Sequence, residues 1–75
     1  MAYYGKLEWL EKIRVAKGYS QDRVAAMAGI SQGMYSKIEL GYRDPTPEQA
    51  ASIAEALEFD AGRFAEEGRM RGAAV

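Results

Sequence analysis

Residues 32 to 40 contain polar side chains of the types that read the edges of base pairs. On a helical wheel with about 100° per residue, one arc carries Gln32, Gly33, Ser36, Lys37 and Leu40. Glutamine can bond to adenine through both ends of its amide, lysine donates to guanine or to phosphate, and serine can contact a base or the backbone. The alternative interpretation is a solvated polar face, so the chemistry depends on how this segment is positioned.

Such a face is useful to a partner only if the other side of the same helix is fixed in a core. Met34, Tyr35 and Ile38 lie on that other side, with the spacing of an apolar helical stripe. Ser31 is a favourable N-cap residue and Gly41 a favourable terminator. The pattern therefore predicts a helix over residues 32–40 with one buried and one exposed side.

A second short helix precedes it, separated by a tight turn. Ser20 is a suitable N-cap, and Gly29 ends this helix because glycine readily adopts the left-handed conformation that such a turn favours. Ala25 is small enough to let the two helices cross closely, while Val24 and Ile30 help to fill the wedge between them. Residues 20–41 thus have the pattern of a helix-turn-helix, which presents its second helix to a major groove.

The remaining sequence predicts three further helices and no strand. The first has an inward face made of Trp9, Leu10, Ile13 and Ala16, and it ends at Gly18. Residues 46–49 are typical of a helix start, with threonine as the cap, proline next and glutamine three residues after the cap. In the helix that follows, the inward residues are Ala50, Ile53, Ala54 and Leu57. Asp60 is expected to cap a short fifth helix that contains Phe64.

The composition restricts the classes of function. The chain of 75 residues has no cysteine, which excludes disulfides and thiolate metal sites, and no histidine, the commonest general base and metal ligand. Its longest apolar run, over residues 24–30, is far shorter than the ~20 residues that cross a bilayer, and no signal-peptide pattern is visible. We expect a cytoplasmic protein without enzyme activity, membrane segment, cofactor, metal site or small-molecule ligand.

The chain is expected to form one domain over residues 1–65, followed by a flexible tail over residues 66–75 in which small and charged residues alternate without helical periodicity. The charge is unevenly distributed along it. Residues 1–45 hold seven Lys and Arg against five Asp and Glu, a balance of +2, and residues 46–75 hold three against six, a balance of −3, which together give the net charge of −1. The first half is therefore better suited to an anionic partner than the whole chain is.

The sequence resembles the Cro and phage-repressor type of helix-turn-helix domain, also called the xenobiotic-response-element class. The resemblance extends from about Leu10 to Phe64. It is carried by Ile13-Arg14, Gly18-Tyr19-Ser20-Gln21, Ala25, Gly29-Ile30-Ser31, Ile38-Glu39, Gly41, Pro45 and Ile53-Ala54-Glu55-Ala56-Leu57. It implies a five-helix, lambda-repressor-like fold in which the second and third helices form the helix-turn-helix.

The resemblance also implies roles for individual residues. The base-reading positions are Gln32, Gly33, Ser36 and Lys37, and the DNA-phosphate positions are Gln21, Ser31, Arg43 and Arg23. Arg14 and Glu39 are expected to form a partly buried ion pair that fixes the recognition helix, the alternative being two unrelated surface charges.

Three features depart from the family pattern. Gly33 stands where many relatives have a base-reading side chain, and Leu40, with Tyr42 nearby, replaces a polar residue at the end of the recognition helix. Tyr3, Tyr4 and Trp9 form an aromatic group that we expect to pack against the first and last helices.

We expect a sequence-specific transcriptional regulator that binds double-stranded DNA as a homodimer, on an inverted-repeat operator and through the major groove. Phage repressors, restriction–modification controllers and antitoxins all use such domains, and the sequence does not choose among them. The alternative is a module of the same fold that binds a protein partner, as an antitoxin does, and reads little DNA.

Overall fold

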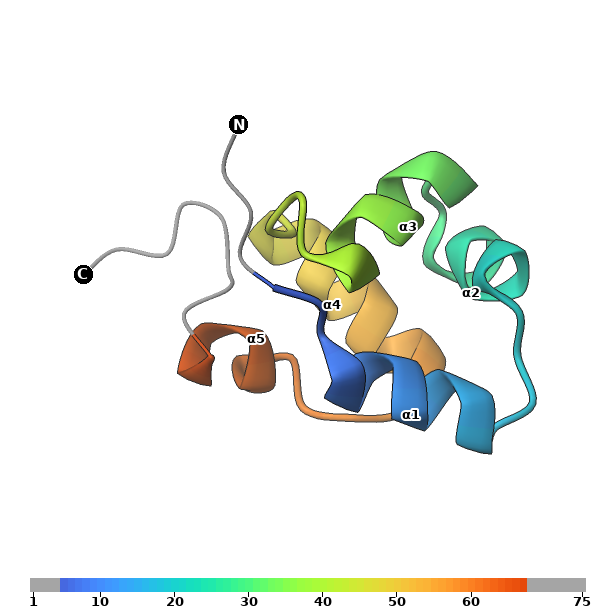
Figure 1. Ribbon diagram of the computed structural model, residues 1–75, viewed down its shortest axis with the longest axis horizontal. Coiled ribbons are helices and arrows are strands. Elements are labelled where there is room, and N and C mark those ends of the chain that lie inside the picture. Colours follow the sequence, from blue (N-terminus) through green and yellow to red (C-terminus); the bar gives the residue numbers. More distant parts are fainter. Residues whose placement is uncertain (1–4, 68–75) are drawn as a thin grey trace.

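The computed structural model describes residues 5–67, and within that range the chain forms five α-helices and no strand. The helices are α1 (Glu8–Ala16), α2 (Gln21–Ala28), α3 (Gln32–Leu40), α4 (Pro47–Leu57) and α5 (Gly62–Glu66). In Figure 1, α3 lies at the top, α1 at the bottom, α4 between them and α5 on the left. The predicted all-α, five-helix fold is confirmed.

The starts of α2, α3 and α4 follow the local rules that predicted them. The side chains of Ser20 and Ser31 accept backbone N–H bonds at the starts of α2 and α3, at 3.1 and 3.0 Å. Thr46 and Gln49 form a reciprocal capping box at the start of α4, which satisfies two backbone donors that the helix itself leaves free. The prediction that Asp60 caps α5 is wrong by one residue: Ala61 occupies the cap position, and the carboxylate of Asp60 accepts the N–H of Gly62 at 2.8 Å.

The core is formed by apolar side chains from all five helices. Its fully buried members include Leu10, Val24, Tyr35, Ile38, Ala50, Ile53, Leu57 and Phe64. Ala16, predicted to face inward, is exposed because α1 ends there and no other element covers this position. Leu7, which precedes α1 and was not predicted to be buried, belongs to the core.

The segment before α1 packs against the end of α3. The N–H of Leu7 donates to the backbone carbonyl of Glu39 at 2.8 Å. Gly41 has a φ of +88°, and a β-carbon placed on it would collide with the backbone of Gly5. Glycine is therefore required at position 41 for two reasons, its left-handed conformation and the close passage of another part of the chain.

An aromatic group joins α1 to α5. The Trp9 ring lies edge-on to Phe59 and to Phe64, with ring centroids 5.3 Å apart in both pairs, and the guanidinium of Arg63 lies over the Trp9 ring at 4.4 Å. Trp9 therefore contributes to packing, as expected. Tyr3 and Tyr4, like most of the predicted tail, lie outside the described residues. Within residues 5–67, no helix has the length and apolar character needed to cross a membrane.

Candidate nucleic-acid interface

The turn between α2 and α3 fixes the angle between these two helices. Gly29 ends α2 with a φ of +73°, and the N–H of Ile30 reaches back to the carbonyl of Ala25 at 3.0 Å. The side chain of Ala25 is buried, so the helices approach closely where a larger residue would separate them. This arrangement leaves one side of α3 at the molecular surface.

The outer side of α3 is made of the residues that the helical wheel placed there. Gln32, Gly33, Lys37 and Leu40 are exposed, and Ser36 is half-buried. A β-carbon added at Gly33 would meet no atom within 4 Å. No side chain therefore covers this surface between Gln32 and the next turn of the helix. The result is a ridge with an amide, a hydroxyl and an ammonium group and with backbone accessible near its start.

The inner side of α3 ends in a buried carboxylate. Glu39 is completely buried and accepts four hydrogen bonds from side chains. Arg14 donates from Nε at 2.9 Å and from Nη2 at 3.1 Å, Gln21 donates from Nε2 at 2.9 Å, and the Tyr35 hydroxyl donates at 2.8 Å. Arg14 and Glu39 therefore lie together as a bidentate pair, and the same carboxylate connects α1, α2 and α3.

The network keeps Glu39 ionised. Burial by itself would raise the pKa of Glu39, but the hydrogen bonds from Arg14, Gln21 and Tyr35, together with the positive charge of Arg14, leave this pKa below its usual value. The bond to Glu39 correspondingly raises the pKa of Arg14. Burial, and then the bond to Glu39, raise the pKa of the Tyr35 hydroxyl, which consequently stays a donor.

The four residues expected at DNA phosphates differ in what they already contact. Gln21 is the first residue of α2 and donates to Glu39, and Ser31 caps α3. The guanidinium of exposed Arg23 lies over the Tyr19 ring at 5.0 Å. Arg43 is half-buried, and its Nε has no hydrogen-bond partner among residues 5–67.

The sequence did not indicate that Gln21 and Tyr35 share the Glu39 carboxylate. Tyr35 and Glu39 are four residues apart on one helix, and this spacing brings side chains together, so the sequence does contain a signal for this contact. Gln21 lies 18 positions from Glu39, and its contact depends on the crossing angle of α2 and α3. No local pattern could have predicted it.

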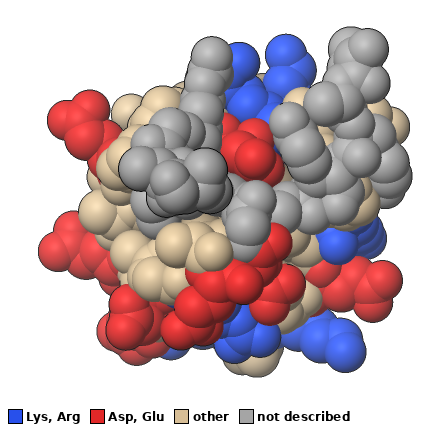
Figure 2. All heavy atoms as spheres, turned by 90° about the vertical axis from the view of Figure 1, so that its left-hand side faces the viewer, with Lys and Arg blue, Asp and Glu red and all other residues tan. Residues whose placement is uncertain are grey.

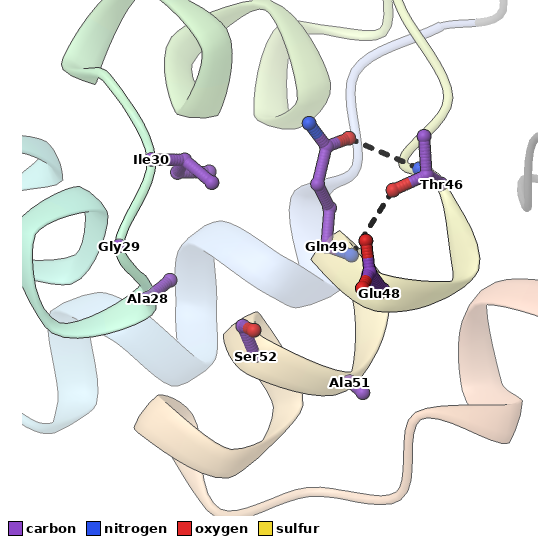
Figure 3. Close-up of a pocket in the computed structure, with 8 residues that line it drawn as sticks. All are labelled: Ala28, Gly29, Ile30, Thr46, Glu48, Gln49, Ala51 and Ser52. Atoms are coloured by element: carbon purple, nitrogen blue, oxygen red, sulfur yellow. Dashed lines mark hydrogen bonds between the residues drawn. The ribbon is translucent and has the colours of Figure 1, made fainter.

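A groove lies between the end of α2 with the turn that follows it and the first half of α4. Small residues line it, with the side chains of Glu48, Gln49 and Ser52 and the capping pair of Thr46 and Gln49 on the α4 side (Figure 3). Gln49 and Thr46 already bond to each other's backbone.

The acidic half of the chain lies on α4, α5 and their connections. Residues 46–67 contain six Asp and Glu and one basic residue, Arg63. Acidic side chains gather on the lower half of the face on which α5 lies (Figure 2). The outer side of α3 has Lys37 and no acidic side chain, so an anionic partner is favoured there over the α5 side.

Comparison with known proteins agrees with this arrangement. The chain matches the model of a family described as helix-turn-helix over residues 10–64. It is 42% identical over 53 residues to the uncharacterized HTH-type transcriptional regulator YqaF of Bacillus subtilis (strain 168), a match that covers 71% of this chain and 70% of that protein. It is 47% identical over 38 residues to the SPbeta prophage-derived uncharacterized HTH-type transcriptional regulator YonR of the same organism, covering 51% of this chain and 35% of that protein.

Proposed function

The chain belongs to the helix-turn-helix family of DNA-binding transcriptional regulators, and from this membership we propose that it reads a specific operator through the major groove as a homodimer. The observation that carries the proposal is the outer side of α3, which is polar, exposed and held from behind by a buried network. A helix presented in this way fits the width of a major groove.

Base reading is assigned to the outer side of α3. Gln32 can bond to adenine through both ends of its amide, Lys37 can donate to guanine, and Ser36 can contact a base or a phosphate. Gly33 is included because its lack of a side chain lets the backbone come close to the base edges. A β-carbon placed on Gly33 would meet no atom within 4 Å, so the space next to this residue is open.

Phosphate contacts are assigned to residues on both flanks of α3. Gln21 and Ser31 begin α2 and α3, where backbone N–H groups and the positive end of the helix dipole favour an anion. Arg43 follows α3 and Arg23 lies on α2, so the two arginines supply positive charge from different sides. Such contacts orient the protein without selecting sequence.

Two copies related by a two-fold axis would place their recognition helices about 34 Å apart, in successive major grooves. The operator is then an inverted repeat. A net charge of −1 provides little general attraction to DNA, so a single copy would depend on a few contacts and the second copy would supply much of the affinity. The proposal includes action as a repressor or controller of transcription.

Selection of genomic fragments on the purified protein, followed by footprinting of the recovered site, tests this function. We expect an inverted repeat protected on one face of the duplex. Alanine at Gln32 or Lys37 should relax the sequence preference at defined positions, whereas alanine at Arg43 should weaken binding to all sequences alike.

A second candidate function is a module that binds a protein partner and reads little DNA. The exposed side chains of Leu40 and Tyr42, 38% and 49% accessible, and the acidic α4–α5 half favour it. The dependence of binding on salt separates the two candidates, because affinity for DNA falls linearly on a logarithmic salt axis with a slope set by the phosphates neutralised. No binding to any fragment at low salt would support the protein-partner module.

A further inference from the structure

We propose that Glu39 is a positioning residue for DNA binding: its buried carboxylate holds the side chain of Gln21 so that the amide presents a hydrogen-bond donor to a phosphate. This inference rests on the proposed function, in which Gln21 contacts the DNA backbone. It goes beyond an ion pair that only stabilises the fold, because it makes the carboxylate responsible for the geometry of one contact with the duplex.

The chemistry of the two groups fixes the orientation of the amide. An ionised carboxylate can only accept hydrogen bonds, so the nitrogen end of the Gln21 amide must face Glu39. The distance from Gln21 Nε2 to Glu39 Oε2 is 2.9 Å. The nitrogen has two hydrogens, of which Glu39 takes one, and the other remains for an anion. A glutamine without this partner would populate several side-chain rotamers.

The same network places the backbone from which Gln21 projects. Arg14 Nη1 donates to the carbonyl of Tyr19 at 2.8 Å, and Tyr19 directly precedes Ser20, the cap of α2. Both the side chain of Gln21 and the chain entering its helix are therefore fixed by groups that converge on Glu39. Fixing a contacting group before binding reduces the entropy lost when the complex forms.

Arg14 also makes the arrangement compatible with a nearby phosphate. An isolated carboxylate behind Gln21 would repel the DNA backbone. The bidentate bonds from Arg14 neutralise this charge, so Glu39 can orient the amide without opposing the anion that the amide binds. Only 12% of the Arg14 side chain is accessible, which limits its own contact with solvent and with DNA.

A double-mutant cycle on DNA affinity tests the inference, using the footprinted operator fragment and a temperature at which circular dichroism shows every variant to be folded. In the natural background, Gln21→Ala should weaken binding by about tenfold, the effect of losing one hydrogen bond to a charged group. In the Glu39→Gln background, the same change should weaken binding by less than about twofold. Equal weakening in both backgrounds overturns the inference.

Arg43→Ala is the matched control, because the hydrogen bonds to the Glu39 carboxylate come from Arg14, Gln21 and Tyr35, whereas Arg43 lies after α3. Its effect on affinity should be the same factor in both backgrounds. If Glu39→Gln also removes the effect of Arg43→Ala, then Glu39 acts through the whole fold rather than through Gln21, and the inference is overturned.

Nuclear magnetic resonance on the natural sequence supplies a second test that does not depend on a variant that may fail to fold. A through-hydrogen-bond correlation should connect the Gln21 side-chain amide to the Glu39 carboxylate carbon, and it should persist when the operator is added. A rotationally averaged Gln21 amide, or loss of the correlation on DNA, overturns the inference.

The outcomes also separate this inference from the proposed function. Sequence-specific binding that is unaffected by Gln21→Ala overturns the inference and leaves the function standing. Absence of binding to any fragment overturns both.

Discussion

The inner side of α3 carries Tyr35 and Glu39, both completely buried, whereas its outer side carries Gln32 and Lys37, both exposed. The inner residues have partners on α1 and α2, and every hydrogen-bonding atom of the Glu39 carboxylate is used. The outer residues contribute to no contact that the fold requires. Under the proposed function, stability and DNA recognition are carried by opposite sides of the same nine-residue helix, so substitutions should separate the two properties.

Removal of the buried carboxylate should have the largest effect. Glu39→Ala leaves Arg14 without its partner in a poorly accessible site, and we expect a loss of about 3–5 kcal/mol in the free energy of unfolding. Chemical denaturation followed by circular dichroism measures it. Lys37→Ala, on the outer side of the same helix, is the matched control and should leave the midpoint nearly unchanged; equal midpoints for both variants would contradict the comparison.

A side chain at Gly41 should be the next most damaging change. Gly41→Ala forces alanine into a left-handed conformation and drives its β-carbon against the backbone of Gly5, so we expect a loss of at least about 2 kcal/mol. Gly18→Ala is the control, because Gly18 has a similar φ of +76° but open space around it. The difference between the two variants in thermal unfolding isolates the collision; no difference would mean that the Gly5 segment does not pack at position 41.

Acid should weaken the hydrogen-bond network on the inner side of α3. The pKa of Glu39 is lower in the folded protein than its ordinary value of 4.5, so the folded state binds this proton more weakly than the unfolded state does. The stability that the carboxylate contributes is therefore complete above about pH 4.5 and is lost as the pH falls through the lower, folded pKa. Denaturation midpoints measured over this window should decline, and the decline should be shallower in Glu39→Gln. Parallel curves would disprove the assignment.

Truncation on the outer side should change binding and leave folding intact. Gln32→Ala should cost about 1–3 kcal/mol of discrimination at one base-pair position, measured by competition between the operator and its single-base variants. Its thermal midpoint should match that of the natural sequence. A variant that loses stability but keeps its base preference would reverse the roles assigned to the two sides.

The smallest effect is expected at Gly33, where a substitution should increase stability and decrease affinity for DNA. Gly33→Ala should raise the free energy of unfolding by up to about 1 kcal/mol, since alanine favours a helix interior and its β-carbon would meet no other group. Binding to the operator should weaken, because the methyl group intervenes where the backbone approaches the duplex. Unaltered affinity would mean that this part of α3 stays away from the DNA.

Local chemistry made most of the helix-turn-helix predictable. Serine caps, terminal glycines and apolar spacing depend on residues a few positions apart, so the ends of α2 and α3 and their inner and outer sides could be derived from the sequence. The position of Leu7 in the core could not, because the segment before α1 has no periodicity and its burial depends on the end of α3.

The candidate site divides in the same way. The outer residues of α3 follow from helical spacing, and the pairing of Arg14 with Glu39 was expected from the family resemblance. The hydrogen bond from Gln21 to Glu39 was not expected, since it depends on the angle at which α2 and α3 cross. The stacking of Arg23 on Tyr19 was not expected either, since it depends on the loop before α2. The identity of the bases that are read could not be predicted, because it depends on contacts with the DNA and not on contacts within the protein.

The packing of Gly5 against Gly41 bears on how small a transferable reading unit can be. Residues 20–41 contain every base-reading candidate, yet the end of α3 is covered by the chain before α1, and the Glu39 carboxylate is neutralised by Arg14. A graft of residues 20–41 onto another scaffold would therefore carry a buried, uncompensated charge and an uncovered helix end. The smallest portable unit that keeps α3 intact must begin no later than Gly5.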